Sequence, residues 1–344
     1  MNKKLSLLVS MGLCLGVMSC TKTEVVSPSS GTLQQTLISN LESNYAFSLF
    51  NYALRKTGLN QVITGTAPYT LLVPDNDAFG RDSIFTTADL DKLDTAYLRQ
   101  WIGYHIVPGN ITVQSVSQTV NSPYKSVLGQ TLYFSRPIPG PSQRQTAGID
   151  EILHINGDTV NTPNVEVSNG TIQVLNRPLK LPVSSVQAYL AASPQYSIFV
   201  TALKNFGLWD QLTGPGPITI FAPDNNSFAY YRLSADSVAR MDTNTYHIAL
   251  FGIYVASGSR VFLTDFTDIG VPNGDLYYTA TNTYLWTTYT NNNLGGLEDF
   301  EGNYYIPGIG YIQPTTWVDE NNIALNGVVQ GIDGLLWVPG QQVK

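Results

Sequence analysis

The spacing of hydrophobic residues alternates along the chain between a helical period and a strand period. Apolar residues recur three or four positions apart between residues 37 and 54, which predicts one or two amphipathic helices ending at Gly58. A mostly apolar run, Tyr69 to Val73, predicts a buried strand ended by Pro74, and helical spacing resumes from Leu90 to Ile102. Later segments rich in Val, Ile, Thr and Tyr, separated by Gly, Asn and Pro, are typical of antiparallel strands. Together these patterns predict an α+β fold.

One stretch of this pattern occurs twice in the chain. Residues 48–79 align with residues 197–228 without a gap, at an offset of 149. A second block, residues 169–173, aligns with residues 326–330 at an offset of 157. Two copies of one domain, differing in length between these blocks, explain both offsets.

The first nineteen residues have the pattern of a secretory signal. Lys3 and Lys4 precede an apolar run, Leu5 to Val17, which is too short for a membrane-spanning helix and is followed by polar residues. The sequence Val-Met-Ser-Cys that ends at Cys20 resembles the lipobox of bacterial lipoproteins, in which the cysteine becomes the lipidated first residue. This resemblance implies that residues 1–19 are removed and that a lipid on Cys20 anchors the protein. The alternative is an ordinary signal peptide with a chance cysteine near the cleavage site.

The chain therefore divides into four predicted parts. Residues 1–19 form the lipoprotein signal peptide, and residues 20–31, rich in Ser, Thr and Pro, form a tether too polar to fold. Residues 32–182 and 183–344 are the two repeats, which we name the first and second modules. The exported protein is expected to be lipid-anchored to the bacterial cell envelope, at the outer membrane, in the periplasmic or the surface-exposed leaflet.

Three blocks of sequence carry a family resemblance. Residues 69–79 and 218–228 resemble the first signature block of fasciclin (FAS1) domains, and residues 103–109 are similar to the central Tyr-His segment. Residues 326–339 resemble the closing block, of which residues 169–182 are a weaker copy. The resemblance implies two tandem FAS1-like modules, each a wedge-shaped antiparallel β-sandwich with packed helices. Proteins with such modules are secreted or membrane-tethered adhesion proteins.

Two departures from the family pattern affect the expected function. His105 of the Tyr-His segment is replaced by Tyr254 in the second module. The Asp-Ile pair that is associated with integrin binding in animal members reads Asn164-Val165 and Asn322-Ile323 here. The sequence therefore gives little support to an integrin-type role, and adhesion rests on the analogy with the family.

Composition narrows the expected partners and chemistry. A formal charge of -7 disfavours binding to nucleic acid and to anionic lipid head groups. Cys14 is discarded with the signal peptide and Cys20 is lipidated, so no disulfide is expected. The sequence contains no nucleophile elbow, phosphate-binding loop or dinucleotide motif, so no cofactor and no catalytic residue are predicted.

Histidines and paired acidic residues are the remaining candidates for catalysis or metal binding. His105 is interpreted as a packed, hydrogen-bonded residue, and His154, on an alternating strand pattern, is expected to be exposed or at an edge. Asp75 and Asp77 resemble part of a calcium loop, but the fifth position is Phe79, which offers no oxygen ligand. Helix capping is therefore the preferred interpretation. The sequence predicts neither a metal site nor an enzyme.

Aromatic residues are concentrated in one stretch of the second module. Ten of them lie in residues 276–317, whereas the corresponding stretch of the first module, residues 110–168, has three. Aromatic rings suit sugar rings, so a ligand site is predicted there. The alternative is that these are ordinary strand residues with alternate rings in the core. The predicted ligand-binding residues are Tyr284, Trp286, Tyr289, Tyr304, Tyr305 and Trp317.

The leading functional interpretation is a non-catalytic adhesion or binding module on the cell surface. Its expected partners are a surface glycan or a protein ligand, and the membrane through the lipid anchor at Cys20. One alternative is a carbohydrate-binding or carbohydrate-processing accessory protein of the envelope, of which the enzyme form requires paired carboxylates lining a pocket. Another is a structural spacer, which requires neither a pocket nor an aromatic patch.

Overall fold

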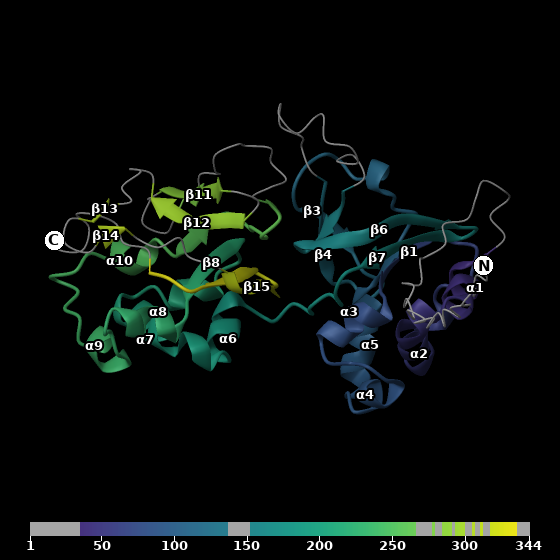
Figure 1. Ribbon diagram of the computed structural model, residues 1–344, viewed down its shortest axis with the longest axis horizontal. Coiled ribbons are helices and arrows are strands. Elements are labelled where there is room, and N and C mark those ends of the chain that lie inside the picture. The colour runs from purple at the N-terminus through teal and green to yellow at the C-terminus, as the bar shows by residue number, and fades with distance from the viewer. Residues whose placement is uncertain are drawn as a thin grey trace, which may run out of the picture.

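The computed structural model consists of two modules joined by one short stretch of chain (Figure 1). It describes residues 35–136, 152–265 and 319–335, with the side chains of all of these except Ala249, and the backbone of short strands between residues 277 and 318. In the view of Figure 1, α3 to α5 (residues 76–104) of the first module and α6 to α9 (residues 186–239) of the second lie below the strands of their modules.

The first module begins with helices, and its strands follow. Its described helices are α1 (Leu37–Ser43), α2 (Ser48–Lys56), α3 (Asn76–Arg81), α4 (Thr87–Asp91) and α5 (Thr95–Tyr104), with short 3-10 helices η1 (Tyr45–Phe47), η2 (Leu59–Gln61) and η3 (Val113–Ser115). Its described strands are β1 (Tyr69–Pro74), β2 (Ile106–Pro108), β3 (Ser122–Lys125), β4 (Thr131–Ser135), β5 (His154–Ile155), β6 (Asp158–Val167) and β7 (Gly170–Leu175).

Local sequence explains where these helices begin and end. Phe50 and Leu54, four positions apart on α2, are both fully buried. Gly58 follows in the left-handed conformation, with φ 71°, and ends this helical segment as predicted. Asp75 accepts a hydrogen bond of 2.7 Å from a backbone N–H in the first turn of α3, and Asp224 accepts one of 2.8 Å in the second module. The capping interpretation of Asp75 is therefore confirmed.

The strands of the first module form one sheet in the order β2-β1-β7-β6-β5-β4-β3. Strand β1 sends Leu71 and Val73 into an apolar core shared with the helices. Leu72 points to the other face, into a second core that includes Phe134 of β4. The α+β prediction is confirmed, with one difference in detail. Strands β1 and β7 pair in parallel, because nearly the whole module lies between them and no hairpin connects them.

The second module repeats this order of elements. Its described helices are α6 (Val186–Ala191), α7 (Ser197–Asn205), α8 (Asn225–Tyr230), α9 (Ala235–Ala239) and α10 (Ala249–Gly252), with 3-10 helices η5 (Pro194–Tyr196) and η6 (Asp210–Thr213). Its described strands are β8 (Ile218–Pro223), β9 (Val255–Ser257), β10 (Tyr277–Tyr278), β11 (Tyr284–Thr290), β12 (Asn293–Asp299), β13 (Tyr305–Ile306), β14 (Gly310–Tyr311), β15 (Trp317–Ala324) and β16 (Gly327–Ile332).

The strand register shows that the two modules are copies of one unit. Strand β1 pairs with β7 in parallel, Tyr69 opposite Gly170. Strand β8 pairs with β16 in parallel, Ile218 opposite Gly327, which are the positions related by the two sequence offsets. Each module also has a core of its own, because the apolar cluster of the second module contains residues from Val186 onward only.

Buried polar side chains have the same roles in both modules. Gln173 donates from Nε2 to a backbone carbonyl and to Asn164 Oδ1, at 2.9 and 3.1 Å. Gln330 makes the same two bonds in the second module, to a carbonyl and to Asn321 Oδ1, at 2.9 and 3.0 Å. Asn164 and Asn321 are both left-handed, with φ 57° and 54°. The counterpart of Asn164 is thus Asn321, so the sequence comparison of Asn164 with Asn322 was wrong by one residue.

Polar contacts join the two modules. Asp265 of the second module is 2% exposed and accepts hydrogen bonds from Asn121 Nδ2 at 2.7 Å and Ser135 Oγ at 3.1 Å in the first module. The guanidinium of Arg260 lies over the ring of Tyr133, 4.4 Å from its centroid. These contacts connect strand β4 and the chain before β3 to the segment that follows β9.

A hairpin of the first module makes a second contact with β15. Gly157 lies in the turn between β5 and β6 with φ 81°, and its carbonyl accepts a hydrogen bond of 3.2 Å from Asn321 Nδ2. A Cβ atom at Gly157 would lie 2.6 Å from the Asn321 side chain, so this close approach requires glycine. Tyr133 also packs on a small apolar cluster of the second module formed by Phe262, Ile323 and Val328. The interface is therefore both polar and apolar.

Among the helices that the structure describes, none has the length and apolar character needed to cross a membrane.

Candidate functional site

The predicted ligand-binding aromatic residues lie between residues 284 and 317, where the structure describes only the backbone of short strands. Tyr284, Trp286 and Tyr289 belong to β11, which pairs antiparallel with β12. Tyr305 begins β13 and Trp317 begins β15. Their side chains, and all of Tyr304 and Cys20, lie outside the described residues. The predictions of a ligand site in this stretch and of lipidation at Cys20 therefore remain predictions.

A groove in the first module is the candidate site within the described residues. It lies between α5, the end of α3 and the extended connector that leads to the second module, and its volume is about 500 Å³. We name it the junction groove. It is lined by Asp82, Tyr97, Trp101, Pro178, Leu179, Lys180, Leu181, Pro182 and Val183.

Trp101 on α5 and His105, which follows the last residue of α5, fix the connector wall of the junction groove. Trp101 Nε1 donates to the carbonyl of Leu179 at 2.8 Å, and the backbone N–H of Leu179 donates to His105 Nε2 at 2.9 Å. Trp101 and His105 lie one helical turn apart, so both reach the same residue of the connector. The wall of the groove is therefore formed before any ligand binds.

Both ring nitrogens of His105 make hydrogen bonds within the first module. Because Nε2 accepts the Leu179 N–H, Nδ1 carries the proton and donates to the carbonyl of Trp101 at 2.7 Å. Burial lowers the pKa of His105 to about 4, against the smaller opposite effect of the Trp101 carbonyl. The interpretation of His105 as a packed, hydrogen-bonded residue is confirmed. The expectation that His154 is exposed or at an edge was wrong, because His154 is only 6% exposed and β5 lies between β4 and β6 in the sheet.

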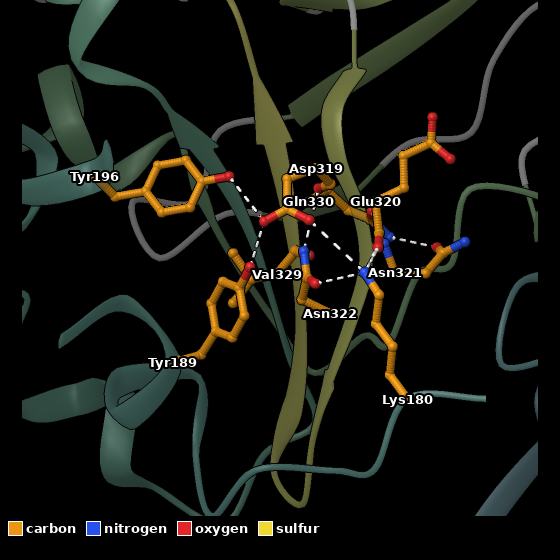
Figure 2. A network of polar contacts seen from close by, with 9 residues as sticks. All are labelled: Lys180, Tyr189, Tyr196, Asp319, Glu320, Asn321, Asn322, Val329 and Gln330. Atoms are coloured by element: carbon orange, nitrogen blue, oxygen red, sulfur yellow. Dashed lines mark hydrogen bonds and ion pairs between the residues drawn. The ribbon is translucent and has the colours of Figure 1, made fainter. Parts of the chain in front are cut away.

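Lys180, on the opposite side of the connector, is held by the second module (Figure 2). Its Nζ donates to the carbonyl of Glu320 at 2.9 Å and to Asn322 Oδ1 at 2.8 Å, and lies 3.7 Å from Asp319 Oδ1. Asp319 also accepts hydrogen bonds from two tyrosine hydroxyls, Tyr189 on α6 and Tyr196 on η5. Lys180 thus links the groove to a polar network of the second module.

Burial and the neighbouring Asp319 raise the pKa values of the two tyrosine hydroxyls in this network. Burial, followed by the hydrogen bond to Asp319, raises the pKa of the Tyr189 hydroxyl well above its usual range. Burial, followed by the charge of Asp319, raises the pKa of Tyr196 in the same way. Both hydroxyls therefore remain protonated and donate to the carboxylate, which makes the network structural.

Two carboxylates near the groove have no direct partner among the described residues. Asp82 is exposed, but neighbouring atoms partly desolvate its carboxyl group and raise its pKa, and the positive charges of Arg177 and Lys180 oppose this shift. Burial likewise raises the pKa of Asp158, at the start of β6, to about 6, against the same two cations. Neither carboxylate makes a hydrogen bond or an ion pair within the described part of the chain. Asp82 lines the groove, so it is available to bind a ligand.

The described residues contain no group of three His, Cys, Asp or Glu side chains that is arranged to hold a metal ion. The junction groove offers aromatic and apolar walls with one uncommitted carboxylate, and the described histidine beside it has no free ring nitrogen. This arrangement is suited to binding rather than to proton transfer.

Comparison of the two copies is the sequence signal that would have found this groove. Asp82 and Trp101 correspond, at the offset of 149, to Tyr231 and Leu250. Residues that one copy has and the other lacks are not required by the shared fold. The differences at Asp82 and Trp101 were not compared, so the groove was missed.

Comparison with known proteins identifies the repeat. The Fasciclin domain family profile matches residues 45–182 and 194–339, one match in each module. Transforming growth factor-beta-induced protein ig-h3 of Sus scrofa is 26% identical over 231 residues, which are 66% of this chain and 30% of that protein. Protein sll1483 of Synechocystis sp. is 26% identical over 168 residues, which are 47% of this chain and 82% of that protein.

The chain also aligns with one solved structure. It is a FAS1 domain pair from the insect cell adhesion molecule fasciclin I, at 17% sequence identity and a TM-score of 0.40. The match covers 88% of this chain and 100% of that chain.

Proposed function

Because this chain belongs to the fasciclin family, we propose that it is a non-catalytic adhesion or binding module of the cell envelope, held at the outer membrane by a lipid on Cys20. The observation that carries the proposal is the pair of family matches, which together span both modules. Fasciclin domains are adhesion-type modules in related proteins. The ligand is a surface glycan or another surface protein.

The geometry of the junction groove supports binding over catalysis. Asp82 is the one carboxylate among the described residues that line it. Hydrolysis of a glycoside by the usual route needs two carboxyl groups about 5 to 10 Å apart across the substrate. His105 holds both ring nitrogens in internal hydrogen bonds, so it does not serve as a general base.

The sequence before the first module supports the membrane anchor. A lipidated Cys20 followed by a polar tether would place both modules outside the bilayer, with freedom to reach a partner. Acyl chains contribute about 0.8 kcal/mol for each buried methylene, so several chains anchor a protein stably.

The anchor is tested by fractionation of cells that produce the full chain. The wild-type protein should sediment with membranes, and Cys20→Ala should release it into the soluble fraction or leave it unprocessed. Cys14→Ala is the matched control, because it removes the other cysteine and should leave the protein in the membrane fraction. A Cys20→Ala protein that is processed normally and stays membrane-bound to the wild-type extent would contradict the anchor.

The binding role is tested separately with the mature protein immobilised on beads. Beads that carry residues 32–344 should bind intact cells, from which the gene has been deleted, several-fold more than beads that carry albumin. Equal binding of cells and of extracellular material by both kinds of bead would contradict an adhesion or binding role.

A further inference from the structure

The junction groove has a preformed wall. Trp101 and His105 together bind both backbone polar groups of Leu179, so the connector is fixed against α5. The volume of the junction groove, about 500 Å³, lies within the range of small-molecule sites, about 300 to 1,000 Å³. A preformed site of this size binds without the entropic cost of ordering its own walls.

One end of the groove presents an accessible aromatic ring. Tyr97, in the first turn of α5, is 47% exposed, and its ring is tilted by 31° against that of Trp101, with 6.1 Å between the centroids. Its counterpart in the second module, Tyr246, packs against the core instead. The shared fold therefore does not require an exposed ring at this position.

Asp82 is the charged group of the groove that remains free to bind. The Lys180 ammonium is committed to the second module through Glu320 and Asn322. Asp82, in contrast, makes no hydrogen bond or ion pair through its carboxylate in the described part of the chain. It caps the C-terminal end of α3, where a negative charge gains nothing from the helix dipole. A role in helix stability therefore does not explain it.

The charges around Asp82 select the kind of ligand. Arg177 and Lys180 already place positive charge near this carboxylate, so it has little need of a cationic ligand. An anionic ligand would meet the charge of Asp82, and the Lys180 ammonium is already bound by oxygen atoms of the second module. A neutral molecule with hydroxyl donors and an apolar face suits the carboxylate and the Tyr97 ring together.

Resting on the binding role proposed above, we infer that the junction groove binds one neutral sugar residue of a glycan. One face of the sugar ring stacks on Tyr97, and a ring hydroxyl donates a hydrogen bond to Asp82. Trp101 and His105 are positioning residues, because they hold the connector wall and His105 does not line the groove.

The test measures binding of the mature two-module protein to an array of neutral oligosaccharides, acidic oligosaccharides, and peptides rich in Lys or Arg. The wild-type protein should bind a neutral oligosaccharide. Tyr97→Ala and Asp82→Ala should each weaken that binding at least tenfold with an unchanged melting temperature, because both residues are exposed. Tyr230→Ala is the matched control, since Tyr230 is 80% exposed on α8, and it should leave affinity unchanged.

The other outcomes separate this inference from the proposed function. Neutral glycan binding that survives Tyr97→Ala and Asp82→Ala would overturn the groove as the site and leave the binding role intact. Binding of basic peptides that is lost in Asp82→Ala would overturn the sugar assignment. Failure on the array, together with positive cell binding by the beads, would overturn the inference alone. Failure in both assays would overturn the inference and the proposed function together.

Discussion

At the scale of a single residue, His105 makes the free energy of unfolding depend on pH. Its pKa is about 4 in the folded protein and about 6.5 in an unfolded chain. The unfolded chain therefore binds the proton more readily, and the contribution of His105 to stability is fully present above pH 6.5. That contribution falls as the pH drops from about 6.5 to about 4 and then levels off.

We expect His105→Gln to reveal this dependence. At pH 7.5 the variant should be less stable than wild type, because it loses the imidazole bonds to Leu179 and Trp101. The difference should shrink by up to about 3 kcal/mol between pH 6.5 and 4, since one pKa unit corresponds to about 1.36 kcal/mol. Chemical denaturation of both proteins at four pH values measures it.

Asp158 also titrates over this pH range, but its effect does not disturb the comparison of the two proteins. Its pKa of about 6 lies above the unfolded value, so its protonation favours the folded state over the same pH range. Both proteins contain Asp158, and its effect cancels in their difference. A difference in stability that stays constant from pH 7.5 to 4 would contradict a buried neutral His105.

At the scale of the element, Gln173 on β7 and Gln330 on β16 are predicted to contribute equally to their modules. Gln173→Leu removes the hydrogen-bond partners of the Asn164 backbone N–H and of the Ile111 carbonyl, and each such group left unpaired costs about 1 to 3 kcal/mol. Either substitution should lower the free energy of unfolding of its own module by roughly 2 to 4 kcal/mol. Gln61→Leu, at an exposed position, is the control and should change it by less than about 0.5 kcal/mol.

Urea denaturation of the two-module protein, followed by hydrogen exchange to assign each transition, provides the measurement. A large loss of unfolding free energy for Gln173→Leu with none for Gln330→Leu would show that the two glutamines do not contribute alike to their modules.

Strands and helices were predictable from the sequence, whereas their partners were not. The residues of β1 and of α2 carry their own periodicity, and the two offsets anticipated the identical registers of the two parallel strand pairs. Periodicity does not encode which strand lies beside which, so the parallel pairing of β1 with β7 was missed. The junction groove was missed for a similar reason. Asp82 and Tyr97 come together with Lys180 only through the fold.

At the scale of the whole molecule, the interface couples two cores that are otherwise separate. Asn121 and Asp265 lie far apart in sequence and belong to no motif, so the sequence offered no signal for their contact. In the two-module protein Asp265 is buried, and its hydrogen bond from Asn121 is of the charged kind that contributes about 1.5 to 3 kcal/mol.

Asn121→Gly should therefore destabilise the two-module protein and leave the stability of the isolated first module nearly unchanged. Glycine keeps the left-handed backbone, with φ 59° at this position, and removes the amide that binds Asp265. We expect the two-module protein to lose about 1.5 to 3 kcal/mol, and the isolated first module, residues 32–182, to change by less than about 0.5 kcal/mol. Calorimetry of both proteins compares them. Equal losses would place the effect inside the first module.

The connector between the modules also has a mechanical consequence. Leu179 is bonded on both sides to α5, while Val183 bonds to Ile323 and Leu325 in the second module. These two anchor points are at most roughly 14 Å apart along the extended chain. Any movement of one module against the other must therefore strain this short connector or break the interface contacts of Asp265 and Arg260.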